Sequence, residues 1–447
     1  MLKGLEVEEI QFQNVLNNPN LRLEAEFFIK KTNLFESFIG AEIIDFVQYG
    51  TSEELNEDRR GYPILRLNEF DGSFLGIPAK YSEKISLDTY RSLEIKKGDV
   101  LICRTNGNLK YVGKAAIAMQ DYSFAFASYL FRIRPNKFIN PETLTVFLNS
   151  KSGRREIEKY AMKGNQSNFS PAKFREIKIP HFSTVLQDEI ESLVSSSFEK
   201  LQKSKEAYQT AQNLLLEHLG LKDFNPPAQA VNIKSFADSF GTSGRLDSEF
   251  YQEKYESYLK KIQAYPNGCE LIRTACKLKD ANYTPKDNQT YRYIELSNIG
   301  NSGEITGASL DLGCNLPSRA RRKVSKNDVI VSSIEGSLAS CAIVSEQYHQ
   351  ALCSTGFYVV SSKKINSETL LMLFKSEPIQ QLLKQGCSGT ILTAINKDEF
   401  LNIPLPLVDA NIQTQIADLI QQSDCLRQKS QALLEEAKRK VEQAIES

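Results

Sequence analysis

Two long segments of the chain carry apolar residues at helical spacing. Neither Gly nor Pro interrupts residues 185–219, and a second segment of similar length lies between residues 412 and 445. The apolar residues at three-, four- and seven-residue steps are Val194, Phe198, Leu201, Tyr208, Leu215 and Leu219 in the first segment and Leu419, Leu426 and Leu433 in the second. This pattern predicts two long helices that bury their apolar stripes on each other as an antiparallel coiled-coil pair.

A body of shorter elements precedes each long helix. In the first body, short segments rich in β-branched and aromatic residues are bounded by Gly, Asn, Asp or Pro, at residues 62–67, 100–103, 115–118 and 129–133. They predict the strands of a mixed, irregular sheet. Helical spacing follows at residues 142–149 and 152–162, and in the second body at 368–376 and 378–385. The predicted fold class is α+β.

The body and its helix are written twice. Residues 95–102 (IKKGDVLI) reappear as residues 324–331 (VSKNDVIV), and residues 139–144 (INPETL) reappear as residues 365–370 (INSETL). A repeat of this length indicates two homologous domains in tandem. The predicted boundaries are residues 1–183 for the first domain, 184–222 for its helix, 223–240 for a linker, 241–407 for the second domain and 408–447 for its helix.

Composition is that of an ordinary globular protein and favours a subunit. Of 447 residues, 41% are hydrophobic and 25% charged, and Lys plus Arg equals Asp plus Glu at 55 each. Because the net charge is zero, affinity for a polyanion must come from local clusters of cations. The spacing of the eight cysteines and three histidines predicts neither a disulfide framework nor a zinc site. The acidic start and the lack of a long apolar stretch predict a cytoplasmic protein.

Three enzyme motifs are incomplete. The Asn-Pro-Pro sequence at residues 225–227 is followed by Ala228 instead of the aromatic residue that stacks a flipped base in amino-methyltransferases. Residues 107–115 separate the P-loop glycines by five residues instead of four, and Ala115 replaces the Mg²⁺-binding hydroxyl. The acidic pattern of metal-dependent nucleases is missing as well. We therefore expect a non-catalytic chain without a metal or cofactor of its own, in which helix-terminal His218 is structural.

Polar loops are the candidates for contacts with DNA. Residues 104–111 lie between two predicted strands, and residues 332–338 are their equivalent in the second copy. Asn, Arg, Lys, Ser and Glu on an exposed turn pair with base edges in the major groove. Both copies are polar here although the residues differ, as expected of two readers of different sequences. A turn that is polar only because it faces solvent is the alternative. Further polar turns precede the last strand of each copy, at residues 164–168 and 386–390.

The predicted DNA contacts include loop residues and a basic cluster. In the loops they are Arg104, Thr105, Asn106, Asn108, Lys110, Tyr111, Lys114, Asn165, Gln166, Asn168, Ser333, Glu335, Ser337 and Thr390. Arg319, Arg321 and Arg322, with Lys323, form a cluster that suits phosphate contacts, and Arg59 and Arg60 are a weaker counterpart. A solvated run of charges is the alternative reading of both clusters.

The order of these motifs resembles the specificity subunit of type I restriction-modification systems. In the first copy the family's motifs are Lys97-Gly98-Asp99-Val100-Leu101, Gly107 with Gly113-Lys114, Gly164-Asn165-Gln166-Ser167, Ile177-Lys178-Ile179-Pro180 and Gln187-Asp188-Glu189-Ile190. In the second they are Lys326-Asn327-Asp328-Val329-Ile330, Gly336, Gly389-Thr390, Ile403-Pro404-Leu405-Pro406 and Gln413-Thr414-Gln415-Ile416. The second copy departs from the pattern at Asn327, which replaces Gly, and lacks the Gly-Lys pair after Gly336.

The resemblance implies two target-recognition domains that each read half of a split DNA site, with the antiparallel helices fixing the gap. It also implies two methyltransferase subunits that methylate adenine with S-adenosylmethionine, and restriction subunits that use ATP and Mg²⁺. Three alternatives remain. The first is the specificity subunit of a type IIB-like or other phage-defence methyltransferase complex. The second is a self-contained methyltransferase or nuclease. The third is a coiled-coil scaffold that binds no DNA.

Overall fold

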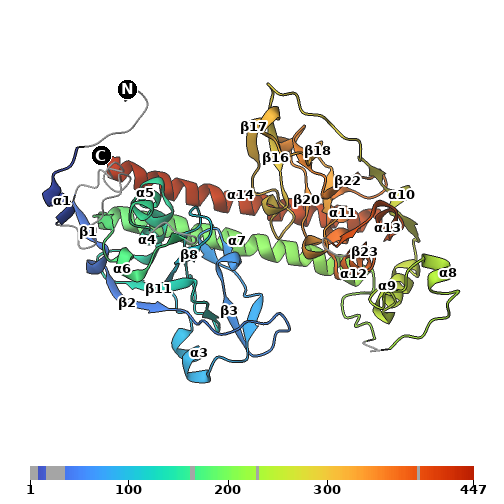
Figure 1. The fold of residues 1–447 in the computed structure, drawn as a ribbon, viewed down its shortest axis with the longest axis horizontal. Helices are drawn as coiled ribbons and strands as arrows, with labels where there is room; N and C mark the ends of the chain where they lie inside the picture. Colours follow the sequence, from blue (N-terminus) through green and yellow to red (C-terminus); the bar gives the residue numbers. More distant parts are fainter. Residues whose placement is uncertain (1–8, 17–35, 162–166, 228–230, 390–392, 447) are drawn as a thin grey trace. The chain divides into compact units, whose positions relative to one another are not determined.

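A computed structural model describes residues 9–16, 36–161, 167–227, 231–389 and 393–446 (Figure 1). The chain divides into two compact units, named here unit 1 (Met1–Leu201 with Gln428–Ser447) and unit 2 (Gln202–Arg427). It passes from unit 1 to unit 2 within the helix α7 (Thr184–His218) and returns within the helix α14 (Ala410–Glu446). The two predicted long helices are confirmed.

Unit 1 is built around a six-stranded sheet with β7 as an inner strand. All four residues of β7 (Val100–Cys103) are buried, because Val100 and Ile102 face one hydrophobic core while Leu101 and Cys103 face another. The strand order is β2 (Ile44–Tyr49), β11 (Leu130–Pro135), β7, β9 (Ala115–Ile117), β5 (Phe74–Leu75) and β4 (Phe70–Asp71). Each face of the sheet therefore has its own core.

Smaller sheets and short helices complete unit 1. The strands are β10 (Ala125–Phe126), β3 (Tyr62–Leu65) and β6 (Lys80–Ser82) in one sheet, β1 (Ser37–Ile39) with β13 (Lys178–Pro180), and β8 (Thr105–Asn106) with β12 (Ser167–Asn168). The helices are α1 (Phe12–Leu16), α3 (Leu87–Leu93), α4 (Pro141–Asn149), α5 (Lys151–Tyr160) and α6 (Pro171–Phe174). β3 ends two residues earlier than predicted, because the Glu69 carboxylate accepts the Arg66 N–H at 2.7 Å and turns the chain.

Unit 2 repeats this plan with two four-stranded sheets. One has the order β15 (Lys277–Leu278), β22 (Phe357–Ser361), β19 (Val329–Ser332) and β20 (Cys341–Ile343). The other has the order β17 (Ser309–Leu312), β16 (Thr290–Ile294), β21 (Leu352–Ser354) and β18 (Ala320–Lys323). Two pairs are added, β14 (Cys269–Leu271) with β25 (Pro404–Pro406) and β23 (Cys387–Ser388) with β24 (Ala394–Ile395). The helices are α8 (Phe240–Ser243), α9 (Glu253–Gln263), α10 (Ile272–Ala275), α11 (Ser367–Lys375), α12 (Glu377–Gln385) and α13 (Lys397–Leu401).

The two units share their pairing pattern as well as their sequence motifs. β7 lies between β11 and β9, and β19 lies between β22 and β20. Parallel pairs recur in β3 with β10 and in β16 with β21. The fold is thus the predicted α+β repeat, with mixed sheets and the predicted pair of short helices in each copy, α4 with α5 and α11 with α12.

The repeated Asn and Gln residues fasten each long helix to its body. Asn140 caps α4 by accepting the Thr143 N–H, while its own N–H donates to Gln187 Oε1 on α7, both at 2.8 Å. Asn366 and Gln413 repeat the contact in unit 2, again at 2.8 Å. A side chain that caps one helix and binds the start of another fixes the angle between them. Gln187 and Gln413, the first residues of the family's helix-start motif, therefore have a structural role in both units.

The repeated Asp of the segment before β7 and β19 closes a tight turn. Asp99 accepts the Lys96 N–H at 2.9 Å, and Asp328 accepts the Ser325 N–H at 2.7 Å. The residue before each Asp has a positive φ, +86° at Gly98 and +66° at Asn327. Asn tolerates this conformation better than other side-chain-bearing residues. The turn therefore keeps its shape although Asn327 replaces the family's glycine.

Changing Asn327 to alanine is expected to destabilise unit 2 by about 1 kcal/mol, because the side chain is exposed and only the left-handed backbone opposes the change. Asn327→Gly is the matched control and should leave stability nearly unchanged. Urea denaturation followed by circular dichroism measures both. An alanine variant as stable as the glycine variant would contradict the account.

Within each unit, segments of α7 and α14 pack on each other. In unit 1, Ser197 pairs with Ser430 and Glu189 with Lys440, so the two helices run antiparallel as predicted. In unit 2, Ser204 pairs with Ser423.

The predicted stripe on α14 needs a correction. Leu419, Leu426 and Leu433 are only half-buried. The buried positions at three- and four-residue steps are Ile416, Ile420, Ser423, Arg427, Ser430, Ala437 and Val441. Small Ser and Ala residues let two helix backbones approach closely, and a search for large apolar residues overlooks them. The leucines lie beside this seam and not within it.

Candidate nucleic-acid interface

In unit 1 the two predicted polar loops meet. β8, in the loop after β7, pairs antiparallel with β12, in register Ser167 to Asn106 and Asn168 to Thr105. The Asn168 side-chain amide donates to Thr105 Oγ1 at 3.1 Å, and the Phe169 N–H donates to the Arg104 carbonyl at 2.8 Å. The structure thus brings Arg104, Thr105, Asn106 and Asn168 together. The predicted contacts Asn165 and Gln166 lie outside the described residues.

Arg104 lies at this junction beside two tyrosines that the sequence analysis did not select. Its guanidinium lies over the Tyr49 ring, 5.3 Å from the ring centre, and its Nε donates to Thr105 Oγ1 at 3.2 Å. Its backbone N–H donates to the carbonyl of Tyr129 at 2.7 Å. Tyr49 and Tyr129 are 47% and 56% exposed. Exposed tyrosine hydroxyls next to a guanidinium group are suited to contact the phosphates of a polyanion such as DNA.

The tip of this loop is held by its own asparagines and by α5. Asn106 Oδ1 accepts the Asn108 N–H at 2.9 Å, and Asn108 Oδ1 accepts the Lys110 N–H at 3.0 Å. Arg154 of α5 donates to the carbonyls of Leu109 and Lys110 at 3.4 and 3.2 Å. Burial lowers the pKa of Arg154. Lys110 remains exposed on this ordered turn.

Two further candidates in the loop differ in exposure. Tyr111 is 41% exposed. Lys114 is only partly exposed, and burial lowers its pKa while Asp71 acts in the opposite direction. Lys114 is therefore placed less favourably for a ligand at the surface than Lys110 or Tyr111.

In unit 2 the equivalent loop lies against the segment before α13. The Glu335 N–H donates to the Thr393 carbonyl at 3.0 Å, and the Ile395 N–H donates to the Ser333 carbonyl at 2.8 Å. The Ser333 hydroxyl donates to the Gly356 carbonyl, and the Ser337 hydroxyl lies 3.0 Å from that of Ser332. The two serines therefore offer mainly acceptor lone pairs, and Glu335 offers a carboxylate. Thr390 lies outside the described residues.

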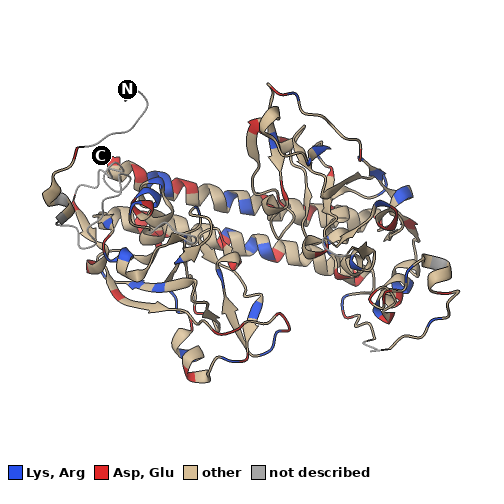
Figure 2. Ribbon diagram, in the orientation of Figure 1, with Lys and Arg blue, Asp and Glu red and all other residues tan. Residues whose placement is uncertain are grey.

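Much of the predicted basic cluster is bound within unit 2. Arg321 donates to the Ser318 carbonyl at 2.8 Å, and Arg322 donates to the Asn282 side chain at 3.1 Å. Arg319 is exposed and lies 3.7 Å from the Glu295 carboxylate. In unit 1, Arg60 pairs with Asp58 at 3.1 Å. Cations and anions are interspersed in both units (Figure 2), so the positive charge at each cluster is partly compensated.

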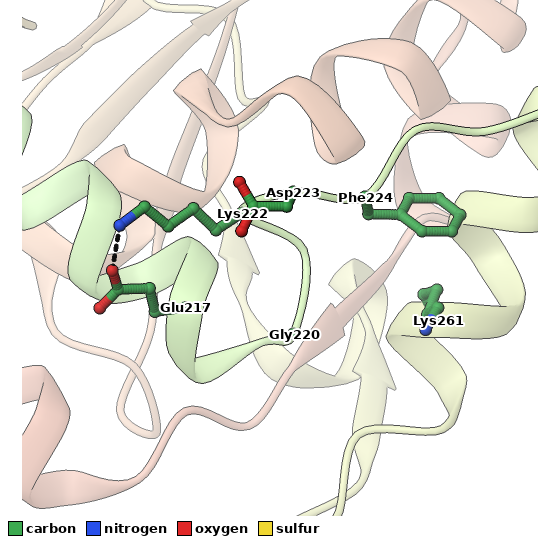
Figure 3. A pocket seen from close by; sticks show the side chains of 6 residues that line it. All are labelled: Glu217, Gly220, Lys222, Asp223, Phe224 and Lys261. Carbon is green, nitrogen blue, oxygen red and sulfur yellow. Dashed lines mark hydrogen bonds and ion pairs between the residues drawn. The ribbon is translucent and has the colours of Figure 1, made fainter.

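A pocket of about 520 Å³ lies in unit 2 where α7 ends (Figure 3). Its lining residues are Glu217, Gly220, Lys222, Asp223, Phe224 and Lys261. Glu217 pairs with Lys222, and Lys261 lies over the Phe224 ring at 5.3 Å. Because Glu217 and Lys222 pair with each other and Lys261 lies on an aromatic ring, the pocket presents few charged groups for a substrate. His218, nearby in sequence, bonds the Tyr265 hydroxyl at 2.7 Å.

Candidate groups for covalent or metal chemistry are sparse in the described residues. All eight cysteines are free thiols, and burial raises the pKa of Cys103 and of Cys341 to about 11. These two thiols are therefore protonated near neutral pH and poor nucleophiles. Among the described ranges no group of three His, Cys, Asp or Glu side chains is arranged to hold a metal ion. Nor does any helix in those ranges have the length and apolarity to cross a membrane.

Comparisons with known proteins agree on one family. Residues 269–439 match the model of the type I restriction modification DNA specificity domain. The type I restriction enzyme StySPI specificity subunit of Salmonella potsdam is 30% identical over 144 residues, which are 31% of this chain and 30% of that protein. The putative type I restriction enzyme MjaX specificity subunit of Methanocaldococcus jannaschii is 22% identical over 414 residues, 90% of both chains.

Two solved structures cover most of the chain at low identity. The S subunit of a type I restriction-modification system from M. genitalium is 13% identical, covers 94% of this chain and 98% of its own, and has a TM-score of 0.40. The HsdS subunit from Thermoanaerobacter tengcongensis is 12% identical, covers 92% and 96%, and has a TM-score of 0.30. Residues 269–439 are thus similar to the DNA specificity domain of type I restriction-modification systems, and both sequence relatives are type I specificity subunits, one of them putative.

Proposed function

We propose that this chain directs a type I restriction-modification complex to its DNA sequence. Unit 1 and unit 2 each contain one of the two target-recognition domains, residues 1–183 and 241–407, and each domain reads one half of a split site. Two partner methyltransferase subunits use S-adenosylmethionine to methylate adenine there, and restriction subunits that use ATP and Mg²⁺ cleave DNA that lacks the methyl group. The chain itself performs no chemistry.

One observation carries this proposal: the same junction of two loops occurs in both units with different side chains. In unit 1 it presents Arg104, Thr105 and Asn168, and in unit 2 it presents Ser333 and Glu335. Arg pairs with guanine, Asn with adenine, and a carboxylate accepts a hydrogen bond from cytosine. A common frame with different donors and acceptors is what two readers of different half-sites require.

The energetics suit a subunit without net charge. Each base pair read wrongly costs about 1 to 3 kcal/mol, so six or seven read pairs give ample discrimination. Joining two readers in one chain makes the second binding event intramolecular and raises the overall affinity. The sequence-independent attraction to phosphates then comes from the partner subunits, which also flip the adenine.

Methylation mapping by single-molecule sequencing tests the proposal. The chain is expressed with its neighbouring methyltransferase in a host without other adenine methylation, and the methyltransferase alone is the control. We expect a methylated adenine motif, split by a fixed gap, that appears only when the chain is present.

Exchange of residues 104–111 for the loop of another specificity subunit should change one half of the motif and leave the other. If both proteins are soluble and associate but no motif appears, the specificity role is wrong and a scaffold without DNA binding is favoured. A motif without a partner restriction gene would instead indicate another type of methyltransferase complex.

A further inference from the structure

We infer that Arg104 reads a guanine in the half-site that unit 1 recognises. The inference rests on the proposed function and adds the base and the residues that determine it. Arg104 is fixed on both sides of its backbone, where its N–H donates to the carbonyl of Tyr129 just before β11 and its own carbonyl accepts from the Phe169 N–H just after β12. The Cα of Arg104 is thereby held at the point where the two polar loops join.

The side chain of Arg104 is held as firmly as its backbone. Its Nε donates to Thr105 Oγ1 at 3.2 Å, and that oxygen also accepts from Asn168 Nδ2 at 3.1 Å. The face of the guanidinium lies over the Tyr49 ring at 5.3 Å. A long side chain that is already ordered loses little freedom on binding, so its hydrogen bonds with a ligand are gained more fully.

The terminal nitrogens of Arg104 are the groups left to bind DNA. Among the described residues, neither Nη1 nor Nη2 of Arg104 makes a hydrogen bond or ion pair. Other arginines of unit 1 are bound at this end: Arg132 to Asp99, and Arg154 to two loop carbonyls. Two parallel N–H donors in one plane match O6 and N7 of guanine in the major groove. A fixed fork of this kind selects G·C over the other base pairs.

Unit 2 has no counterpart of this group. The equivalent position is Ser333, whose hydroxyl donates to the Gly356 carbonyl at 3.0 Å. The contact is therefore expected in one half-site only, which makes it distinguishable from a general attraction to DNA. A phosphate contact by Arg104 is the competing account, and it would strengthen binding to every sequence equally.

Methylation mapping of variants separates the two accounts. Arg104→Ala should make one G·C position of one half degenerate, with preference for G reduced roughly 10- to 100-fold, and leave the other half unchanged. Thr105→Val removes the acceptor that orients Nε and should relax the same position to a smaller extent. Arg91→Ala is the matched control, because it removes an exposed arginine of α3 in the same unit.

The possible outcomes are distinct. If the wild-type chain yields no motif, the proposed function fails and not only this inference. If the wild type yields a motif, three results for Arg104→Ala would show that the guanine contact is wrong. The motif stays unchanged, methylation falls equally for all DNA sequences, or the position that becomes degenerate is not a G·C pair. If Arg104→Ala is misfolded by circular dichroism, Thr105→Val decides, and an unchanged motif in that variant overturns the inference.

Discussion

Replacing Asp99 with alanine is expected to destabilise unit 1 by about 4 kcal/mol. The Asp99 carboxylate is fully buried and lies 3.0 Å from Arg132 and 2.8 Å from Arg134. The Arg132 side chain is only 3% exposed, and burial already lowers its pKa. Loss of Asp99 leaves that guanidinium buried without its counter-charge and also frees the Lys96 N–H.

Hydrogen exchange measured by mass spectrometry is the suitable test, because it reports each unit separately and the chain has no tryptophan. Peptides from residues 95–118 should lose protection in Asp99→Ala. Asp328→Ala is the matched control in unit 2. Its partner Lys279 is 30% exposed and reaches water without Asp328, so we expect a cost of only about 1 to 2 kcal/mol. Equal effects of the two changes would contradict this account.

Local patterns in the sequence were sufficient to predict the helices and strands that the two copies share. The apolar run at β7 and the helical spacing of α4 and α5 predict elements that the structure contains almost residue for residue. The repeated Asn of residues 139–144 and 365–370 was visible as well, but not its bond to a Gln at the start of the following long helix. Periodicity identifies elements, whereas contacts between distant segments need the fold.

The candidate interface was only partly predictable for the same reason. β8 and β12 have two residues each and are about 60 residues apart, so no periodicity indicates that they pair. Tyr49 and Tyr129 have apolar residues beside them in the sequence. Their side chains are exposed because the sheet ends at Tyr49 and begins after Tyr129, which only the fold shows. The residues of the basic cluster were found, but not their bonds to the segment around Asn282.

The seam between the long helices was the feature least predictable from the sequence. A substitution in it is nevertheless expected to have the second large effect on stability. Ser204 and Ser423 are buried in unit 2, and the hydroxyl of each donates to the backbone carbonyl of the other at 2.7 Å. The backbones must lie close for these bonds to form. Ser204→Leu adds a bulky side chain where there is no space and is expected to destabilise the helix pair by about 3 kcal/mol.

Smaller changes at the same seam separate steric crowding from hydrogen bonding. Ser204→Ala removes one buried hydroxyl and should cost about 1 kcal/mol. The double variant Ser204→Ala with Ser423→Ala should cost less than the sum of the two single changes, because either single change already removes the 3.0 Å contact between the two hydroxyls. Thermal unfolding and exchange in peptides of α7 and α14 measure all four proteins.

An additive double variant would contradict the contact between the two hydroxyls. A leucine variant as stable as the alanine one would contradict the close approach of the two helices.

The pairing of the serines also bears on the register of the two helices. Ser197 with Ser430 and Ser204 with Ser423 are seven residues apart on both helices, so a slip by one heptad leaves one serine on each helix opposite alanine or, in the other direction, opposite isoleucine. A buried polar contact of this kind discriminates between registers of a coiled coil even where it adds little to stability. We therefore expect the two serine pairs to favour one register of the helix pair over its neighbours.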